Sequence, residues 1–128
     1  MLDSNNKINW FEIPTLDIKK SKAFYESIFV IEMKYLELPD EKLAFFSWNG
    51  DYNLNTGILI EREGHLPSKD GTLIFFDANP DLDIVLNKVE KFGGEILHAK
   101  KDVGENGYLA VFSDIDGNSI GLHSNKQE

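Results

Sequence analysis

The sequence predicts an α+β fold made of two similar modules, each with a strand, a helix and three further strands. Three observations lead to this prediction. Segments with the apolar patterns of strands and helices occur in the same order in both halves of the 128-residue chain. Both predicted helices carry apolar residues spaced seven and then three apart, and a polar stretch separates the halves. We therefore expect a single domain with a first module, residues 1–63, a linker, residues 64–71, and a second module, residues 72–128.

The first module begins with a strand over residues 8–13, where aromatic and β-branched residues alternate with polar ones before Pro14 ends the strand. Asp17 then supplies a favourable N-cap for a helix over residues 18–29. Its apolar residues Ile18, Phe24, Tyr25 and Ile28 fall on one side. The patterns that follow predict three strands separated by turn-forming residues. These strands cover residues 30–38, 42–48 and 54–62.

The second module repeats this order after the breaker-rich linker. A strand over residues 72–77 precedes Asn79 and Pro80, which together form a strong start signal for a helix. The helix carries an apolar stripe and ends at Gly93-Gly94. The stripe consists of Leu82, Val85, Leu86, Val89 and Phe92. The remaining strands, the last two joined by a turn at Asp116-Gly117, cover residues 95–99, 108–113 and 119–123.

The composition excludes several classes of function. Thirteen Lys and Arg against 22 Asp and Glu leave a formal net charge of −9. Such a surface repels polyphosphate, and no basic patch offsets it, so we expect no binding to nucleic acid or membranes. The absence of cysteine removes disulfides, thiolate zinc sites and thiol nucleophiles. Because the chain starts without an apolar signal region and has no run long enough for a membrane helix, we expect a cytoplasmic protein.

Three segments carry a family resemblance. They are Trp10-Phe11-Glu12-Ile13-Pro14 with Asp17 and Ala23-Phe24-Tyr25; Asp81-Leu82-Asp83 running to Gly93-Gly94; and Gly107-Tyr108 running to Asp114-Ile115-Asp116-Gly117-Asn118. Together with the element order, they resemble the vicinal oxygen chelate superfamily, which includes glyoxalase I, fosfomycin- and bleomycin-resistance proteins and extradiol dioxygenases. The resemblance implies paired βαβββ modules that form a half-open barrel around one cavity. It also implies a homodimer, with modules exchanged between chains in some relatives.

Metal-dependent members of this superfamily carry His, Glu or Gln ligands on the first and last strands of each module. Carried over by position, three of the four ligand positions fall on Trp10, Thr72 and Gly121. An indole offers only an N–H donor, glycine has no side chain, and threonine is a poor ligand. We therefore expect no metal ion and no other cofactor, with the Trp10 indole filling the space opposite Gly121. The fourth position stays open between Thr56, Gly57, Leu59 and Glu61.

The expected cavity wall follows from strand alternation, because residues two apart share a face. Counted from the ligand positions, and with aromatic residues able to stack on a planar ligand added, the wall consists of Trp10, Glu12, Trp48, Thr72, Ile74, Phe76, Tyr108, Ser119, Gly121 and His123. Tyr52 is a further stacking candidate.

Glu12 and His123 are the candidate catalytic residues on this wall, since a carboxylate beside an imidazole raises its basicity and makes a general base near neutral pH. The alternative is a Glu12 that is merely paired or solvated at the cavity mouth and a His123 on a fraying last strand. His65 is expected to be exposed in the linker, and His98 lies either at the core edge or in the pocket.

Three functional hypotheses remain open at this point. The first is a protein that binds a small organic molecule in a metal-free aromatic cavity, as the resemblance to bleomycin-resistance proteins implies, with a preference for cationic or neutral ligands. The second is a lyase or isomerase related to lactoylglutathione lyase, which uses a non-standard metal site or the Glu12–His123 pair. The third is an accessory subunit with a vestigial cavity and a functional dimer surface.

Overall fold

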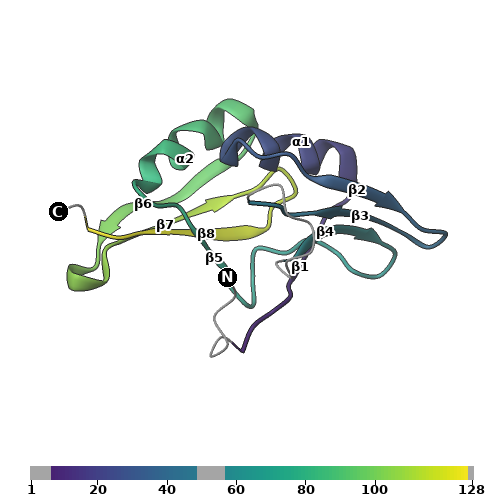
Figure 1. Ribbon diagram of the computed structural model, residues 1–128, viewed down its shortest axis with the longest axis horizontal. Helices are drawn as coiled ribbons and strands as arrows, with labels where there is room; N and C mark the ends of the chain where they lie inside the picture. Colours follow the sequence, from purple (N-terminus) through teal and green to yellow (C-terminus); the bar gives the residue numbers. More distant parts are fainter. Residues whose placement is uncertain (1–6, 49–56, 127–128) are drawn as a thin grey trace.

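The computed structural model describes residues 7–48 and 57–126, which form two four-stranded sheets with two helices on the same side of them (Figure 1). The first module contains β1 (Glu12–Pro14), α1 (Ile18–Phe29), β2 (Lys34–Glu37), β3 (Glu41–Phe45) and β4 (Ile58–Arg62). The second contains β5 (Phe75–Asp77), α2 (Leu82–Val89), the 3-10 helix η1 (Glu90–Phe92), β6 (Glu95–Asp102), the 3-10 helix η2 (Gly104–Asn106), β7 (Tyr108–Ser113) and β8 (Ser119–Ser124). The predicted α+β class and the paired βαβββ order are confirmed, and the sheets form no closed barrel.

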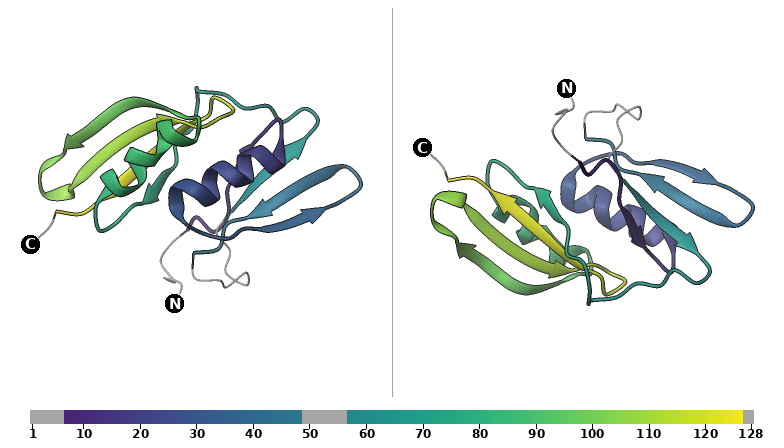
Figure 2. Two further views of the ribbon diagram at one scale, coloured as in Figure 1. Left: turned by 90° about the horizontal axis from the view of Figure 1, so that it is seen from above. Right: turned by 90° about the horizontal axis from the view of Figure 1, so that it is seen from below.

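The two sheets have the same topology. Their strand orders are β1-β4-β3-β2 and β5-β8-β7-β6, so the first strand of each module pairs with its last. That pairing is parallel in both modules, whereas the other pairs are antiparallel. The modules lie side by side with α1 next to α2, as both views in Figure 2 show. The repeat that the sequence pattern predicts is therefore present in three dimensions.

One hydrophobic core lies between the helices and the sheets and extends through both modules. Its centre is a group of aromatic rings in which Phe76 of β5 contacts rings of the first module. The ring centroid of Phe76 lies 5.0 Å from that of Phe29, 5.3 Å from that of Phe46 and 5.7 Å from that of Phe11. Large aromatic side chains contribute most of the burial energy of a small core, so each module completes the core of the other.

The loop between β7 and β8, residues 114–118, ties the second module to the start of α1. The hydroxyl of Tyr25 donates to Asp114 Oδ2 at 2.7 Å, and both groups are buried. The Asp116 carboxylate accepts the hydroxyl of Thr15 and the backbone N–H of Leu16. The Asn118 amide adds a bond to the Pro14 carbonyl. The Asp-x-Asp-Gly-Asn motif is therefore a structural connection between modules.

Several strand boundaries differ from the predicted ones. The first strand includes Pro14, which is tolerated because β1 is an edge strand and proline there removes no bond from a second neighbour. The predicted strand over residues 30–38 shortens to β2 because Val30 caps α1 in the left-handed conformation, with φ 55° and ψ 55°. Tyr52 and the predicted strand start at residues 54–56 lie outside the described residues.

The predicted N-cap of the second helix is wrong. Asp81, and not Asn79, caps α2, and its side chain accepts the N–H of Asp83 at 2.9 Å. The Asn79 side chain instead accepts the N–H of Asn125 at 2.7 Å, and its peptide bond to Pro80 is cis. Both Asn and Asp are favoured N-caps, so the sequence offers two start signals and the one directly before the apolar stripe is used.

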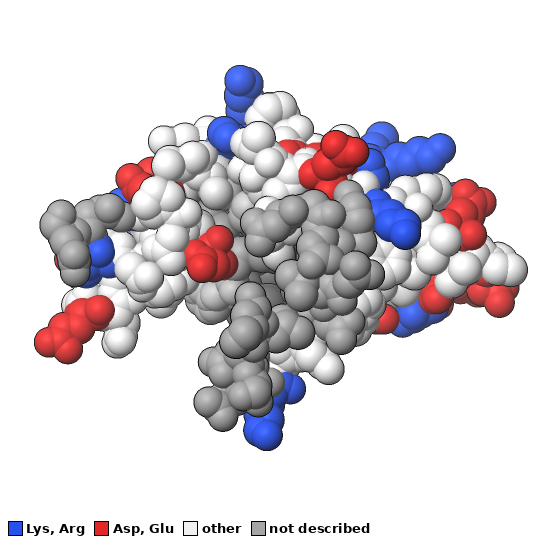
Figure 3. Space-filling view, viewed as in Figure 1, with Lys and Arg blue, Asp and Glu red and all other residues white. Residues whose placement is uncertain are grey.

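Charged side chains of both signs are interspersed over the face shown in Figure 3. In the ranges 7–48 and 57–126, no helix is both long and apolar enough to cross a membrane.

Candidate functional site

We call the face of each sheet that is turned away from the helices the outer face. In the first module, this face carries Glu12 and the side chains around it. Glu12 is in register with Ile58, which is in register with Phe45, so these three side chains share the outer face. The ring of Trp10 lies edge-on to that of Phe45, with centroids 6.2 Å apart, and the indole is 41% exposed. An aromatic pair and a carboxylate therefore lie next to each other on this face.

Two basic residues hold the Glu12 carboxylate. Arg62, the last residue of β4, places Nη2 3.2 Å from Glu12 Oε1 and Nη1 3.1 Å from Glu41 Oε2. His65 Nε2 lies 3.5 Å from the same Glu12 oxygen. The hydrogen bond to Glu41, with a smaller contribution from Glu12, raises the pKa of Arg62, so the guanidinium stays charged. We call Glu12, Glu41, Arg62 and His65 the Glu12 cluster.

Two neighbouring cavities, here called the paired cavities, are lined by residues of the Glu12 cluster. The smaller has a volume of about 140 Å³ and lies where β1, the linker and β8 meet. It is lined by Glu12, Ile13, Pro14, Leu66, Ser68, Asp70, Thr72, Ile74, Asn118, Ser119 and Ile120. The larger has a volume of about 380 Å³, and its lining includes Glu41, Arg62 and His65. Leu66 lines both cavities, so the linker separates them.

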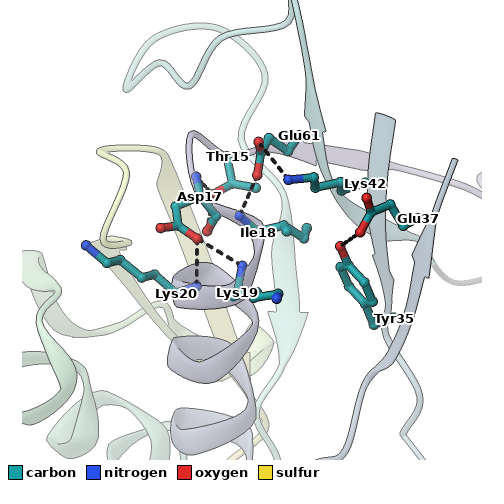
Figure 4. Close-up of polar contacts among 9 residues, drawn as sticks. All are labelled: Thr15, Asp17, Ile18, Lys19, Lys20, Tyr35, Glu37, Lys42 and Glu61. Atoms are coloured by element: carbon teal, nitrogen blue, oxygen red, sulfur yellow. Dashed lines mark hydrogen bonds and ion pairs between the residues drawn. The ribbon is translucent and has the colours of Figure 1, made fainter. Parts of the chain in front are cut away.

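Glu61 and Lys42 form a polar wall of the larger cavity, next to the start of α1 (Figure 4). Glu61 Oε1 accepts the N–H of Ile18 at 2.9 Å, and its other oxygen lies 3.9 Å from Lys42 Nζ. Asp17 caps the same helix by accepting the N–H groups of Lys19 and Lys20. These contacts satisfy the free N–H groups of the first helical turn, so Glu61 positions the helix.

A second polar contact at this wall joins neighbouring residues of β2 (Figure 4). The hydroxyl of Tyr35 donates to Glu37 Oε1 at 2.8 Å, and this bond raises the pKa of Tyr35. Glu37 lines the larger cavity, so its carboxylate reaches the cavity already hydrogen-bonded.

The structure brings four of the predicted wall residues together around the smaller cavity, and these are Glu12, Thr72, Ile74 and Ser119. Phe76 is elsewhere, because it is 6% exposed and lies in the core under the helices. The register pairs Gly121 with Phe75, so Gly121 and Phe76 face opposite sides of the sheet, and the prediction of a shared wall is wrong. The error arises because alternation was counted from Thr72, which precedes the start of β5.

The space at Gly121 is filled by Phe75 and not, as predicted, by Trp10. A Cβ atom on Gly121 would overlap the Phe75 ring, so any larger residue at this position has to displace that ring. Phe75 is 41% exposed, so this ring covers Gly121 on the outer face.

The structure does not bring Glu12 and His123 together. His123 Nε2 lies 2.6 Å from the backbone oxygen of Asn106, beside η2. His123 is four residues along β8 from Ser119, which lines the cavity that Glu12 also lines, and four residues of strand span about 13 Å. The imidazole next to Glu12 therefore belongs to His65, which the sequence placed in an exposed linker.

The remaining predicted residues lie away from the paired cavities. The ring of Tyr108 lies 4.4 Å from Lys100 Nζ and 4.3 Å from Lys126 Nζ. Trp48 stacks on Phe46 with centroids 5.4 Å apart. His98 is in register with Val111 in the second sheet.

Sequence reasoning missed Arg62 and His65. Ile58, Ile60 and Arg62 alternate along β4 and therefore share the outer face. This pattern could have identified Arg62 from the sequence. No periodic signal identifies His65, because it lies in a loop whose path the sequence pattern does not define.

The residues present do not fit the metal shell of a metal-dependent relative. Trp10 offers no lone pair, and Gly121 is covered by the Phe75 ring. Within the described part of the chain, no three His, Asp or Glu side chains converge as metal ligands would. We therefore derive no chemical step through a metal ion.

Two βαβββ modules with the same sheet topology and one shared core define the class of α+β proteins to which this fold belongs. The chain belongs to the Glyoxalase/Bleomycin resistance protein/Dioxygenase superfamily, whose sequence model matches residues 7–122. A search of curated proteins finds no match.

Solved structures share the fold. A hypothetical protein, SA1046, from S. aureus has a TM-score of 0.65 and 23% identity, covering 93% of this chain and 94% of that one. The fosfomycin resistance protein FosX from Listeria monocytogenes has a TM-score of 0.67 and 18% identity, covering 94% of each chain. A glyoxylase/bleomycin resistance protein/dioxygenase domain from Frankia sp. EAN1pec has a TM-score of 0.69 and 16% identity, covering 96% and 100%.

Proposed function

We propose that this protein binds a small organic molecule in the paired cavities, with Glu12 as the central polar contact and without a metal ion. One observation carries the proposal: the Glu12 carboxylate lines the smaller cavity, of about 140 Å³, and is held by Arg62 and His65, which line the larger cavity, of about 380 Å³. Small-molecule sites are typically concave, with a few positioned polar groups among apolar ones. The membership of the family supports the same function.

The polar groups favour a neutral or cationic ligand that donates hydrogen bonds. In the described part of the chain, Glu12 contacts Arg62 and His65 through Oε1, which leaves Oε2 to accept from a ligand. Asp70 adds a second carboxylate to the smaller cavity, and Leu66 and Ile74 supply apolar contacts. An anionic ligand would meet both carboxylates and would be repelled.

A ligand screen by thermal shift, followed by calorimetry in the presence and absence of EDTA, tests the proposal. Ligand binding to the native state raises the melting temperature, and the affinity is expected to be unchanged by the chelator. Glu12→Gln removes the charge while keeping the shape, and we expect it to weaken binding at least tenfold. Glu105→Gln, a change on η2 away from the paired cavities, is the matched control and should bind normally.

Two results would overturn the proposal. One is equal affinity in Glu12→Gln and the unchanged protein for every ligand that the screen identifies. The other is stoichiometric, tight binding of zinc, nickel, manganese or iron that is lost in Glu12→Gln, because this would make Glu12 a metal ligand.

A second candidate function, a lyase or isomerase reaction, is favoured by the 3.5 Å separation of Glu12 Oε1 and His65 Nε2. A carboxylate at this distance can orient an imidazole that acts as a general base. This pair replaces the predicted Glu12–His123 pair, whose members lie apart. Turnover of a bound ligand that is abolished in His65→Gln, with binding retained, would distinguish catalysis from binding alone.

Homodimer formation and a cytoplasmic location stay predictions. Sedimentation equilibrium at micromolar concentrations measures the first directly.

A further inference from the structure

A third cavity, of about 280 Å³, lies on the helix side of the molecule and shares no lining residue with the paired cavities. We propose that it is a second binding site, whose ligand is an organic cation with an apolar body. The cavity lies between the C-terminal end of α1 and the β5–α2 connection. Its lining comprises Ile28–Ile31, Trp48, Asp77–Asp81, Ile84, Val85 and Lys88.

The apolar wall consists of side chains that the fold leaves exposed. Trp48 is 39% exposed, Ile84 53% and Val30 73%. The Trp48 ring is stacked on Phe46 at 5.4 Å, and the edge of Phe29 lies against it at 5.3 Å. An indole held by two rings, with part of its surface exposed, offers a fixed surface for a cation, and tryptophan binds cations better than the other aromatic residues.

The backbone at Val30 supports a role for this wall. Val30 caps α1 in the left-handed conformation, where glycine is usual and a β-branched residue is strained. In the described ranges it is the only residue other than glycine with a positive φ. Because its side chain is mostly exposed, core packing does not compensate for the strain. A contact between the isopropyl group of Val30 and a ligand would explain why valine, and not glycine, occupies this position.

The charges around the cavity favour a positive ligand. The last turn of α1 contains no basic residue, so the negative end of the helix dipole faces the cavity uncompensated. Asp77 lines the cavity, and its contact with the N–H of Asn79 uses Oδ1. Asp81 also lines it, although Lys100 neutralises part of this charge at 3.1 Å.

Among the described residues, Lys88 of α2 is the one basic residue of the lining, and its substitution tests whether the ligand is positively or negatively charged. If the ligand is a cation, the Lys88 ammonium opposes it, and removing this charge strengthens binding. If the ligand is an anion, Lys88 is its partner, and the same change weakens binding. A single substitution therefore separates the two classes of ligand.

The experiment is a fluorescence titration with benzyltrimethylammonium, in a Trp10→Phe background that leaves Trp48 as the only one of the two tryptophans. Phenylacetate, an anion with a similar ring, is the matched probe. We expect saturable quenching by the cation and a dissociation constant that Asp77→Asn raises about threefold and Lys88→Gln lowers about threefold, as single charges at such sites do. Glu12→Gln should leave this titration unchanged, which separates the third cavity from the paired cavities.

Three outcomes would overturn the proposal. Quenching that does not saturate shows that the ring meets only free solute. Tighter binding of phenylacetate, weakened by Lys88→Gln, shows an anion site. Loss of the signal in Glu12→Gln shows that the probe occupies the paired cavities. Near-ultraviolet circular dichroism of each variant checks that the fold is retained.

Discussion

Replacing Asp114 with alanine is expected to destabilise the fold strongly, because this carboxylate is the buried acceptor at the centre of the 114–118 loop. It accepts the hydroxyl of Tyr25 at 2.7 Å, the Asn118 amide at 3.0 Å, and the backbone N–H groups of Asp116 and Asn118 at 2.9 and 3.0 Å. The substitution leaves these donors without their acceptor, in a site where Asp114 itself is 3% exposed.

The magnitude follows from these contacts. A buried donor that loses its acceptor costs about 1–3 kcal/mol. The Tyr25 hydroxyl and the Asn118 N–H are buried, whereas the Asp116 N–H is only partly buried and can recover a bond to water. Burial already penalises the charged carboxylate and raises the pKa of Asp114, which offsets part of the loss. We expect a net loss of about 3–4 kcal/mol in the free energy of unfolding.

Urea denaturation at pH 7, followed by circular dichroism, measures this loss. Tyr25→Phe is the matched control, because it removes only the hydroxyl and should cost about 1–2 kcal/mol. The double variant should cost about 1 kcal/mol less than the sum, since the two groups share a hydrogen bond. A loss below about 1 kcal/mol in Asp114→Ala, or strict additivity, would refute the reasoning.

Three further outcomes are expected. Burial raises the pKa of Asp114 above its ordinary 3.8. The contribution of this side chain to the free energy of unfolding is therefore complete below pH 3.8, and it falls as the pH rises through the raised pKa. The stability advantage of the native protein over Asp114→Asn should thus shrink between pH 4 and pH 7 in urea titrations, and a constant difference would contradict this. Gly121→Ala forces the Phe75 ring aside and should cost about 1–2 kcal/mol, which Phe75→Ala in the same chain should largely restore. Val30→Gly relieves the left-handed strain and should raise the thermal midpoint, with a stabilisation of about 0.5–1 kcal/mol; a lower midpoint would show that the isopropyl group is needed for folding.

The element order was predictable from the sequence because each segment carries a long periodic signal. The helix over residues 18–29 matches α1 in the structure, and all four of its predicted apolar residues are buried. These are Ile18, Phe24, Tyr25 and Ile28. The boundaries of short strands were less predictable, because their ends depend on pairing with residues far away in the chain.

The site was only partly predictable. Glu12, Thr72, Ile74 and Ser119 line one cavity, and the prediction had grouped them by strand alternation counted from the ligand positions that the resemblance implies. Phe76 was assigned to the wrong face of the sheet because alternation was counted from Thr72, which lies outside β5. An error of one residue in such a count moves a side chain to the opposite face. His65 could not be identified, since the path of a loop depends on tertiary contacts.

The connection between the 114–118 loop and the start of α1 also affects how the chain is made. The residues that hold Thr15 and Pro14 lie 101 and 104 positions later in the sequence. At about 5–20 residues per second, a ribosome needs about 5–20 s to synthesise this stretch. During that time the first module lacks its partner loop, and until residue 76 is synthesised it also lacks the Phe76 ring of its core. The first module therefore cannot complete its connection to the 114–118 loop until synthesis has almost reached the last strand, β8.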